Sequence, residues 1–392
     1  MGEEAPIVKI VNNLITEAIL QGASDIHIEP LEAIVRTRYR IDGVLYEHQS
    51  LPKKIQPGVT SRVKILANMD IAERRLPQDG RISLKFEGRR IDFRVSALPT
   101  VHGEKIVLRI LDATSALLPL EKLGFSSENF RKFEDAIAQP YGMVLISGPT
   151  GSGKTTTLYS ALTRLNTTAR NIVTVEDPVE YRLKGINQVQ VNLKAGVTFA
   201  NTLPYILRQD PDIILIGEIR DKETARIAIE AALTGHLVFS TIHTNDAASI
   251  PTRLIDMGIE PFLVASSIIG ATAQRLVRRI CKSCKVPHDP PKSVLEHVGL
   301  DMNKIEGISF YKGEGCDKCN HTGYKGRLAA QEFLSISPDI QNLIINRASA
   351  RDIREKAREE GMKTLLDDAL TKAAEGVTTI EEVLRVVSTV EV

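Results

Sequence analysis

The residues best suited to chemistry form a glycine-rich segment, GPTGSGKT, at positions 148–155. It fits the pattern G-x-x-x-x-G-K-[ST], follows the apolar run MVLIS and precedes KTTTLYSALTRL, which has a helical pattern. Glycines let several backbone N–H groups point at one phosphate, and the helix N-terminus adds partial positive charge. We expect Lys154 to contact the β- and γ-phosphates of ATP and the Thr155 hydroxyl to bind Mg²⁺. The expected nucleotide-binding residues are Gly148, Pro149, Thr150, Gly151, Ser152, Gly153, Lys154, Thr155 and Thr156.

Acidic residues at the ends of two further apolar segments could support hydrolysis. The run DIILIG ends in Gly217 and is followed by Glu218, whereas a strand of this kind usually ends in an Asp that binds Mg²⁺. We therefore expect Glu218 to activate the attacking water. Magnesium would then need ligands from the acidic residues at the end of NIVTVE, namely Glu176, Asp177 and Glu180. The alternative for each of these acids is a helix cap.

Two histidines flank the apolar run LVFSTI. In a parallel sheet the ligand lies beyond the carboxyl ends of the strands, and His243 stands at such an end. We expect His243 to sense the γ-phosphate or to couple hydrolysis to movement. His236 precedes the run and is the weaker candidate. The alternative for both is an ordinary hydrogen-bonded polar residue.

Four cysteines, in the motifs CKSC and CDKC, form the second chemical centre. Cys281, Cys284, Cys316 and Cys319 lie within one short window of a long chain that begins without an export signal. Four thiolates make a closed tetrahedral Zn²⁺ site, which stabilises structure and leaves no coordination position for catalysis. Disulfides or free thiols are the alternatives.

The elements that must position these residues fall into two patterns. Residues 7–19 have helical spacing, and from Asp25 to about Ile110 the period becomes that of strands, with hairpin turns at Asp42-Gly43 and Glu87-Gly88. From Gly142 onward, short apolar strands alternate with helical segments, which predicts a parallel sheet covered by helices. The expected divisions are an α+β sheet domain at 1–112, a linker at 113–127, an ATPase core at 128–277, a zinc-binding subdomain at 278–330 and a helical region at 331–392.

Composition excludes several classes of protein. The 392 residues are 43% apolar and 25% charged, which is typical of a globular chain. Fifty basic residues against 49 acidic ones leave no basic excess for direct binding to nucleic acid. No uncharged stretch is long and apolar enough to cross a bilayer. We expect a cytoplasmic protein, and any membrane role would be through partners.

The motifs together resemble a known family. GPTGSGKTTTLYSAL, TVEDPVEY, RQDPDIILIGEIRDKETA and TGHLVFSTIHTNDA are similar to the Walker A, Asp-box, atypical Walker B and His-box segments of the secretion superfamily ATPases. ASDIHIEP, RYRIDGVL, AERRLPQDGRIS and the paired cysteine motifs narrow the resemblance to the ATPases of type IV pilus assembly (PilB-like) and type II secretion (GspE-like). The resemblance runs from near residue 5 to the C-terminus.

The resemblance implies a RecA-like P-loop domain that hydrolyses ATP. It also implies a homo-hexameric ring that drives an inner-membrane platform protein to add pilin subunits. Type II secretion is the nearest alternative, and a pilus retraction ATPase fits less well because that branch typically lacks the cysteine quartet. A DNA translocase and a small-molecule kinase are more distant alternatives. The chain begins at the sheet domain, without the N-terminal region through which such relatives dock, so either it is trimmed or docking lies elsewhere.

Two arginines of the sheet domain complete the expected site. Arg94 alternates with Phe93 and Val95, so it points away from the apolar face of its strand, and Arg109 does the same beside Leu108. The alternative is a solvated polar face. By resemblance, the matching residues in the family reach the nucleotide of a neighbouring subunit, and arginine's planar fork suits phosphate. Arg81 is a weaker candidate for the same role.

Overall fold

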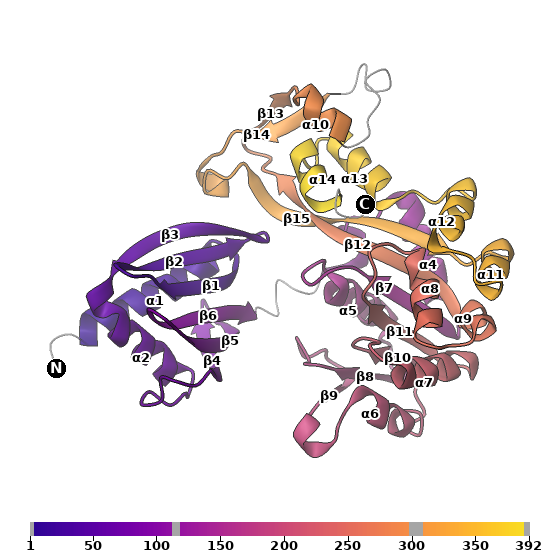
Figure 1. The fold of residues 1–392 in the computed structure, drawn as a ribbon, viewed down its shortest axis with the longest axis horizontal. Coiled ribbons are helices and arrows are strands. Elements are labelled where there is room, and N and C mark those ends of the chain that lie inside the picture. The colour runs from indigo at the N-terminus through magenta and orange to yellow at the C-terminus, as the bar shows by residue number, and fades with distance from the viewer. Residues whose placement is uncertain (1–3, 112–117, 298–308, 388–392) are drawn as a thin grey trace. The chain divides into compact units, whose positions relative to one another are not determined.

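The chain forms two compact units, Met1–Ala116 and Leu117–Val392. The computed structural model describes residues 4–111, 118–297 and 309–387 (Figure 1). Part of the expected linker, residues 113–117, lies outside these ranges. The rest of it belongs to the second unit, since Leu120 and Leu123 are buried in that unit's core. Each unit is described by itself.

The first unit is a six-stranded antiparallel sheet in the order β3-β2-β1-β6-β5-β4, with both helices on one face (Figure 1). Side chains alternate along its strands, so Phe93 and Val95 join the buried core while Arg94 lies on the opposite face. The elements are α1 Glu4–Leu20, β1 Ala23–Pro30, β2 Ile34–Ile41, β3 Val44–Pro52, α2 Gln56–Leu66, β4 Gln78–Phe86, β5 Arg89–Thr100 and β6 Gly103–Leu111.

The sequence predicts one helix here, whereas the structure has two. Helix α2 has Pro57 and Gly58 in its first turn and carries few apolar residues, so its helical period is weak in the sequence. Val59 and Val63, one turn apart, are fully buried against the sheet. A Cβ at Gly58 would lie 2.3 Å from Ile7 Cδ1, so the glycine is what allows α1 and α2 to pack closely.

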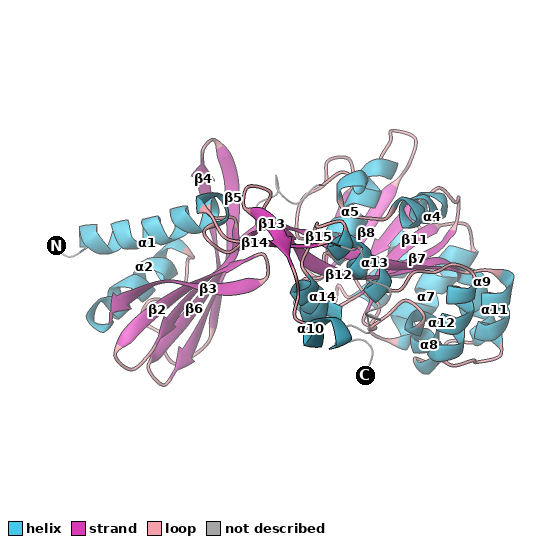
Figure 2. Ribbon diagram, turned by 90° about the horizontal axis from the view of Figure 1, so that it is seen from above, coloured by secondary structure: helices cyan, strands magenta, loops and turns pink. Residues whose placement is uncertain are grey.

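The second unit is a seven-stranded sheet in the order β15-β12-β7-β11-β10-β8-β9, in which β15 pairs antiparallel and the other pairs are parallel (Figure 1). Helices cover both faces (Figure 2): Val144 of β7 belongs to a core that it shares with residues of α4 and α5, and Met143 belongs to the core on the other face, which includes residues of α6–α9 and of the C-terminal helices. The predicted α/β class is confirmed. The elements are α4 Ser127–Ile137, β7 Gly142–Ser147, α5 Lys154–Leu165, β8 Ile172–Glu176, β9 Asn187–Gln190, α6 Phe199–Ile206, β10 Ile213–Ile216, α7 Lys222–Leu233, β11 Leu237–Ile242, α8 Ser249–Asp256 and α9 Pro261–Ser267.

The segment that contains the four cysteines, residues 281–319, lies between two long strands of this sheet. Strands β12 Ile268–Ile280 and β15 Tyr324–Ser335 run unbroken across both boundaries expected for a zinc-binding subdomain, at 277/278 and 330/331. Their long antiparallel pairing holds the segment as an extension of the sheet. The remaining elements are β13 Lys285–His288, α10 Lys292–His297, β14 Phe310–Gly313, α11 Pro338–Ile345, α12 Ala350–Glu359, α13 Leu365–Ala374 and α14 Ile380–Val387. Among the described residues, no helix has the length and apolar character needed to span a membrane.

Candidate functional site

The phosphate loop, residues 148–155, leaves the end of β7 and enters α5 at Lys154. Three of its glycines have positive φ: 145° at Gly148, 80° at Gly151 and 90° at Gly153. This region favours glycine, because a side chain would meet its own backbone. No side chain of the described residues caps the N-terminus of α5. Its first N–H groups can therefore serve an anion.

The side chains around the loop fit a phosphate ligand. Lys154 Nζ lies against the loop itself, donating to the carbonyl oxygens of Gly148 (2.7 Å) and Pro149 (3.0 Å). Burial lowers the pKa of Lys154, and the Glu218 carboxylate counteracts this. The hydroxyls of Ser147 and Ser152 are buried and have no hydrogen-bond partner in the described part of the chain. Buried polar atoms left unpaired beside a ring of N–H groups suit an oxyanion ligand.

Glu218 lies at the same edge of the sheet as the loop. It follows β10, and His243 follows β11, which stands between β7 and β10. The Glu218 carboxylate contacts Arg220 Nη2 at 2.5 Å and His243 Nε2 at 3.3 Å, and its side chain is 13% exposed. The structure thus brings together Glu218, His243 and the phosphate loop. Arg220 stands two residues after Glu218 in the segment GEIRDKE, but no local sequence pattern indicated a role for it.

Glu176 also ends a strand at this edge, but both of its oxygens are already engaged. They accept hydrogen bonds from the hydroxyls of Thr174 and Tyr159 and from Gln188 Nε2 at 3.1 Å, and Glu176 is 4% exposed. Burial raises the pKa of Tyr159, and the nearby Glu176 carboxylate raises it further. The Tyr159 phenol therefore keeps its proton and donates it in the hydrogen bond to Glu176. This hydrogen-bond network is sufficient to account for a buried carboxylate at position 176. Its role toward Mg²⁺ stays a prediction.

The other acids after β8 lie nearer solvent. Asp177 is exposed and Glu180 is half-buried, with its backbone N–H 3.3 Å from the Tyr159 hydroxyl. His236, in contrast, precedes β11 and its carbonyl accepts from Gly142 at the start of β7, so it lies at the opposite edge of the sheet from the phosphate loop. Its Nδ1 is 2.9 Å from the carbonyl oxygen of Ala231. The structure does not bring His236 to the site.

The predicted arginines share one row of the first unit. Arg81, Arg94 and Arg109 are directly paired across β4, β5 and β6, and Asp25 of β1 continues the row. Directly paired residues lie on the same face of a sheet. Arg109 Nε is 2.9 Å from Asp25 Oδ1, which fixes its direction. The row places three guanidinium groups side by side on the polar face.

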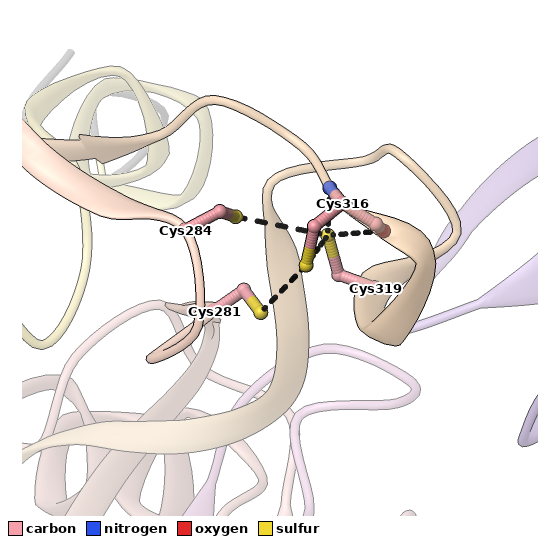
Figure 3. A group of neighbouring side chains, drawn as sticks. All are labelled: Cys281, Cys284, Cys316 and Cys319. Carbon is pink, nitrogen blue, oxygen red and sulfur yellow. Dashed lines mark hydrogen bonds between the residues drawn. The ribbon is translucent and has the colours of Figure 1, made fainter.

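The four cysteines converge (Figure 3). Their Sγ atoms all lie within 4.8 Å of one another, with separations of 3.9 Å for Cys281–Cys316, 3.9 Å for Cys284–Cys319 and 3.8 Å for Cys316–Cys319. Sulfurs bound to one Zn²⁺ at about 2.3 Å are about 3.8 Å apart in a tetrahedron. A disulfide would need about 2.05 Å. The spacing therefore fits the predicted metal ligands and excludes disulfides among them.

Removing the metal should destabilise the second unit. The expected zinc content is one ion per chain, and both Cys316→Ser and chelation should lower the melting temperature, because a closed zinc site adds its binding free energy to folding. Atomic absorption and thermal melting measure both effects. His321→Ala is the matched control, since that exposed imidazole is paired with Asp317 at 3.2 Å and should not bind the metal. A fully folded, metal-free wild type would contradict the assignment.

Comparison with known proteins agrees with this geometry. Residues 1–385 match the family described as "Type II/IV secretion system protein". The "Type IV pilus assembly ATPase PilB" of Thermus thermophilus is 52% identical over 97% of this chain, which spans 43% of that protein. The "Type II secretion system ATPase E" of Vibrio cholerae is 49% identical over 98% of this chain and 76% of its own length.

Solved structures agree as well. A crystal structure of the pilus retraction motor PilT with bound ADP matches 95% of each chain, with 26% identity and a TM-score of 0.63. The fold and the family predicted from the motifs are thus confirmed, while the match divides between pilus assembly and type II secretion. The chain belongs to the type II/IV secretion system protein family, whose named relatives include ATPases of both machineries.

Proposed function

We propose that this chain is a motor ATPase that hydrolyses ATP and powers type IV pilus assembly. The observation that carries the proposal is the meeting of the phosphate loop, Glu218 and His243 at the carboxyl edge of β7, β11 and β10. ATP and Mg²⁺ are the substrate and cofactor, and the working form is a homo-hexamer. It acts in the cytoplasm on an inner-membrane platform protein and meets the membrane only through such partners, without direct binding to nucleic acid.

The chemistry follows from the positions of the side chains. Backbone N–H groups of the loop donate to the phosphates, and Lys154 exchanges the carbonyls of Gly148 and Pro149 for the β- and γ-phosphates. The Thr155 hydroxyl, exposed at the start of α5, and the acids after β8 would hold Mg²⁺. The ion, when bound, neutralises charge on the phosphates. Glu218 accepts the proton of the attacking water.

Arg220 and His243 orient the base. Each contacts one oxygen of the Glu218 carboxylate, so the group is held from two sides. The Arg220 guanidinium pairs with the carboxylate and so fixes the direction of the oxygens that would accept the proton. His243 is exposed apart from this contact, and it can pass a change at the γ-phosphate to the loop that follows β11.

One variant in the living cell tests the machinery served. We expect chromosomal Lys154→Ala to abolish surface pili while secretion of folded exoproteins continues, because the lysine is needed for ATP turnover. Loss of secretion with normal pili would instead favour the type II system, to which the Vibrio cholerae relative belongs. Lys363→Ala, a lysine outside the site, is the control. If the purified wild type hydrolyses no ATP in the absence of any acceptor, the proposed function is wrong.

A further inference from the structure

Strand β12 passes beside the phosphate loop and contributes a buried glutamine to it. Gln274 is 2% exposed, and its Nε2 donates to the carbonyl oxygen of Ser152 at 2.7 Å. Its Oε1 accepts from Thr157 Oγ1, in the first turns of α5, at 2.9 Å, and from Gln331 Nε2 at 3.0 Å. One amide therefore ties the loop, the helix after it and strand β15 together.

The loop is also shaped to fit against this residue. A Cβ at Gly148 would lie 2.5 Å from the carbonyl oxygen of Gln274, and a Cβ at Gly153 would lie 2.7 Å from its Nε2. Both distances are too short for real contacts, so these glycines bring the loop against Gln274. The Gln274 side-chain amide thereby fixes the position of the phosphate-loop backbone, whose N–H groups would bind the phosphates.

The next residue reaches the other half of the site. Arg275 is 6% exposed; its Nη1 donates to the carbonyl oxygen of Gln274 at 3.1 Å and its Nη2 to that of Asn245 at 3.0 Å. Asn245 stands two residues after His243 in the loop that follows β11. Burial lowers the pKa of Arg275, and Glu332 opposes that shift. Burying a cation costs desolvation free energy. A buried guanidinium that joins two backbone carbonyls therefore indicates that the positions of those carbonyls are important.

The loop that follows β11 has further contacts at Asp246 and Ala247. Asp246 forms an ion pair with Arg354 of α12, and Glu332 of β15 accepts from the backbone N–H of Ala247 at 2.5 Å. These contacts fix the loop after Asn245. Arg275 thus joins Asn245 to strand β12 at Gln274, the residue that contacts the phosphate loop.

We propose that Gln274 and Arg275 are positioning residues of the nucleotide site, Gln274 for the phosphate loop and Arg275 for the loop that carries His243. The inference rests on the proposed nucleotide function, and it assigns a different loop of the nucleotide site to each residue. Because ADP and ATP share the phosphates that the phosphate loop would bind first, and differ only in the γ-phosphate, Gln274 would affect the binding of both. Arg275 positions the loop that carries His243, and it therefore affects only the binding and hydrolysis of a nucleotide that has a γ-phosphate. A role in core stability alone would produce no such division.

Calorimetry with ADP and with a non-hydrolysable ATP analogue tests the division. For Gln274→Met we expect affinity for both nucleotides to fall about tenfold, the worth of one or two buried hydrogen bonds. For Arg275→Met we expect unchanged ADP affinity, about tenfold weaker analogue binding and a lower kcat. Arg275→Lys should not restore them, since an ammonium lacks the fork that spans two carbonyls.

The control and the contradicting outcomes are separable. Asn129, 3% exposed, donates to the carbonyl oxygen of Gln331 but does not touch the loop, so Asn129→Ala should lower the melting temperature without changing either affinity. If Gln274→Met does not fold, Gln274→Glu keeps the acceptor and places a negative charge under the phosphates, with the same expected loss. Folded variants that bind both nucleotides as the wild type does overturn the proposal. A wild type that binds neither overturns the proposed function instead.

Discussion

We expect the Glu218→Gln variant to bind ATP as the wild type does but to hydrolyse it roughly 10²- to 10⁴-fold more slowly, the usual contribution of a positioned general base. The amide keeps the size of the side chain and can still accept from Arg220, but it cannot take a proton from water. The carboxylate is 13% exposed and held between Arg220 and His243, so no solvent base can readily replace it. Steady-state phosphate release and nucleotide affinity measure the two effects separately.

A matched control isolates the loss of the base. Glu230 of α7 is exposed and paired with Arg226 at 2.6 Å, so Glu230→Gln also removes one charge of an ion pair. Its turnover should equal that of the wild type. If Glu218→Gln retains most of its activity, the base lies among the acids after β8, and Glu180→Gln becomes the decisive variant.

Local sequence signals were sufficient to predict the nucleotide edge of the sheet. The predicted helix KTTTLYSALTRL is α5, Lys154–Leu165, because a glycine turn precedes it and its apolar residues have a helical period. Glu218 and His243 meet because parallel strands end at one edge, a rule that holds without knowledge of side-chain packing. Pattern and topology together therefore predicted that Glu218, His243 and the phosphate loop share one edge of the sheet, and their chemical roles stay predictions.

Long-range packing was beyond the same reasoning. Gln274 touches Ser152 across 122 positions of the chain, and nothing in the run AQRLVRR indicates that its glutamine lies beside the phosphate loop. The cysteine motifs change the local composition near the predicted boundaries 277/278 and 330/331, while β12 and β15 continue through both, so these boundaries stay predictions. Glu176 shows the reverse case, in which a motif acid accepts hydrogen bonds from three side chains that its sequence did not reveal.

We expect Arg94→Ala to lower ATP turnover by roughly 10³- to 10⁵-fold, the range for an arginine finger, with nucleotide affinity nearly unchanged. Arg94 stands between Arg81 and Arg109 in one row of the polar face, and planar guanidinium groups are suited to bind phosphate oxygens. Arg90 is the matched control: it lies on the same strand and face, is exposed and pairs with Asp92 at 3.1 Å. Arg90→Ala should keep full turnover. Equal loss in both variants would indicate damage to the sheet.

Mixing two inactive variants decides whether Arg94 acts on its own chain's nucleotide or on that of a neighbour. Lys154→Ala lacks the loop lysine but keeps Arg94, and Arg94→Ala has the opposite defect. In a ring assembled from equal amounts of both, about a quarter of the interfaces join an intact loop to an intact arginine, so part of the activity should return. An arginine acting within its own chain predicts no recovery, because each chain then carries one complete defect. Recovery on mixing would mean that assembly itself completes the active site, so hydrolysis in one subunit depends on the position of the sheet domain in the next.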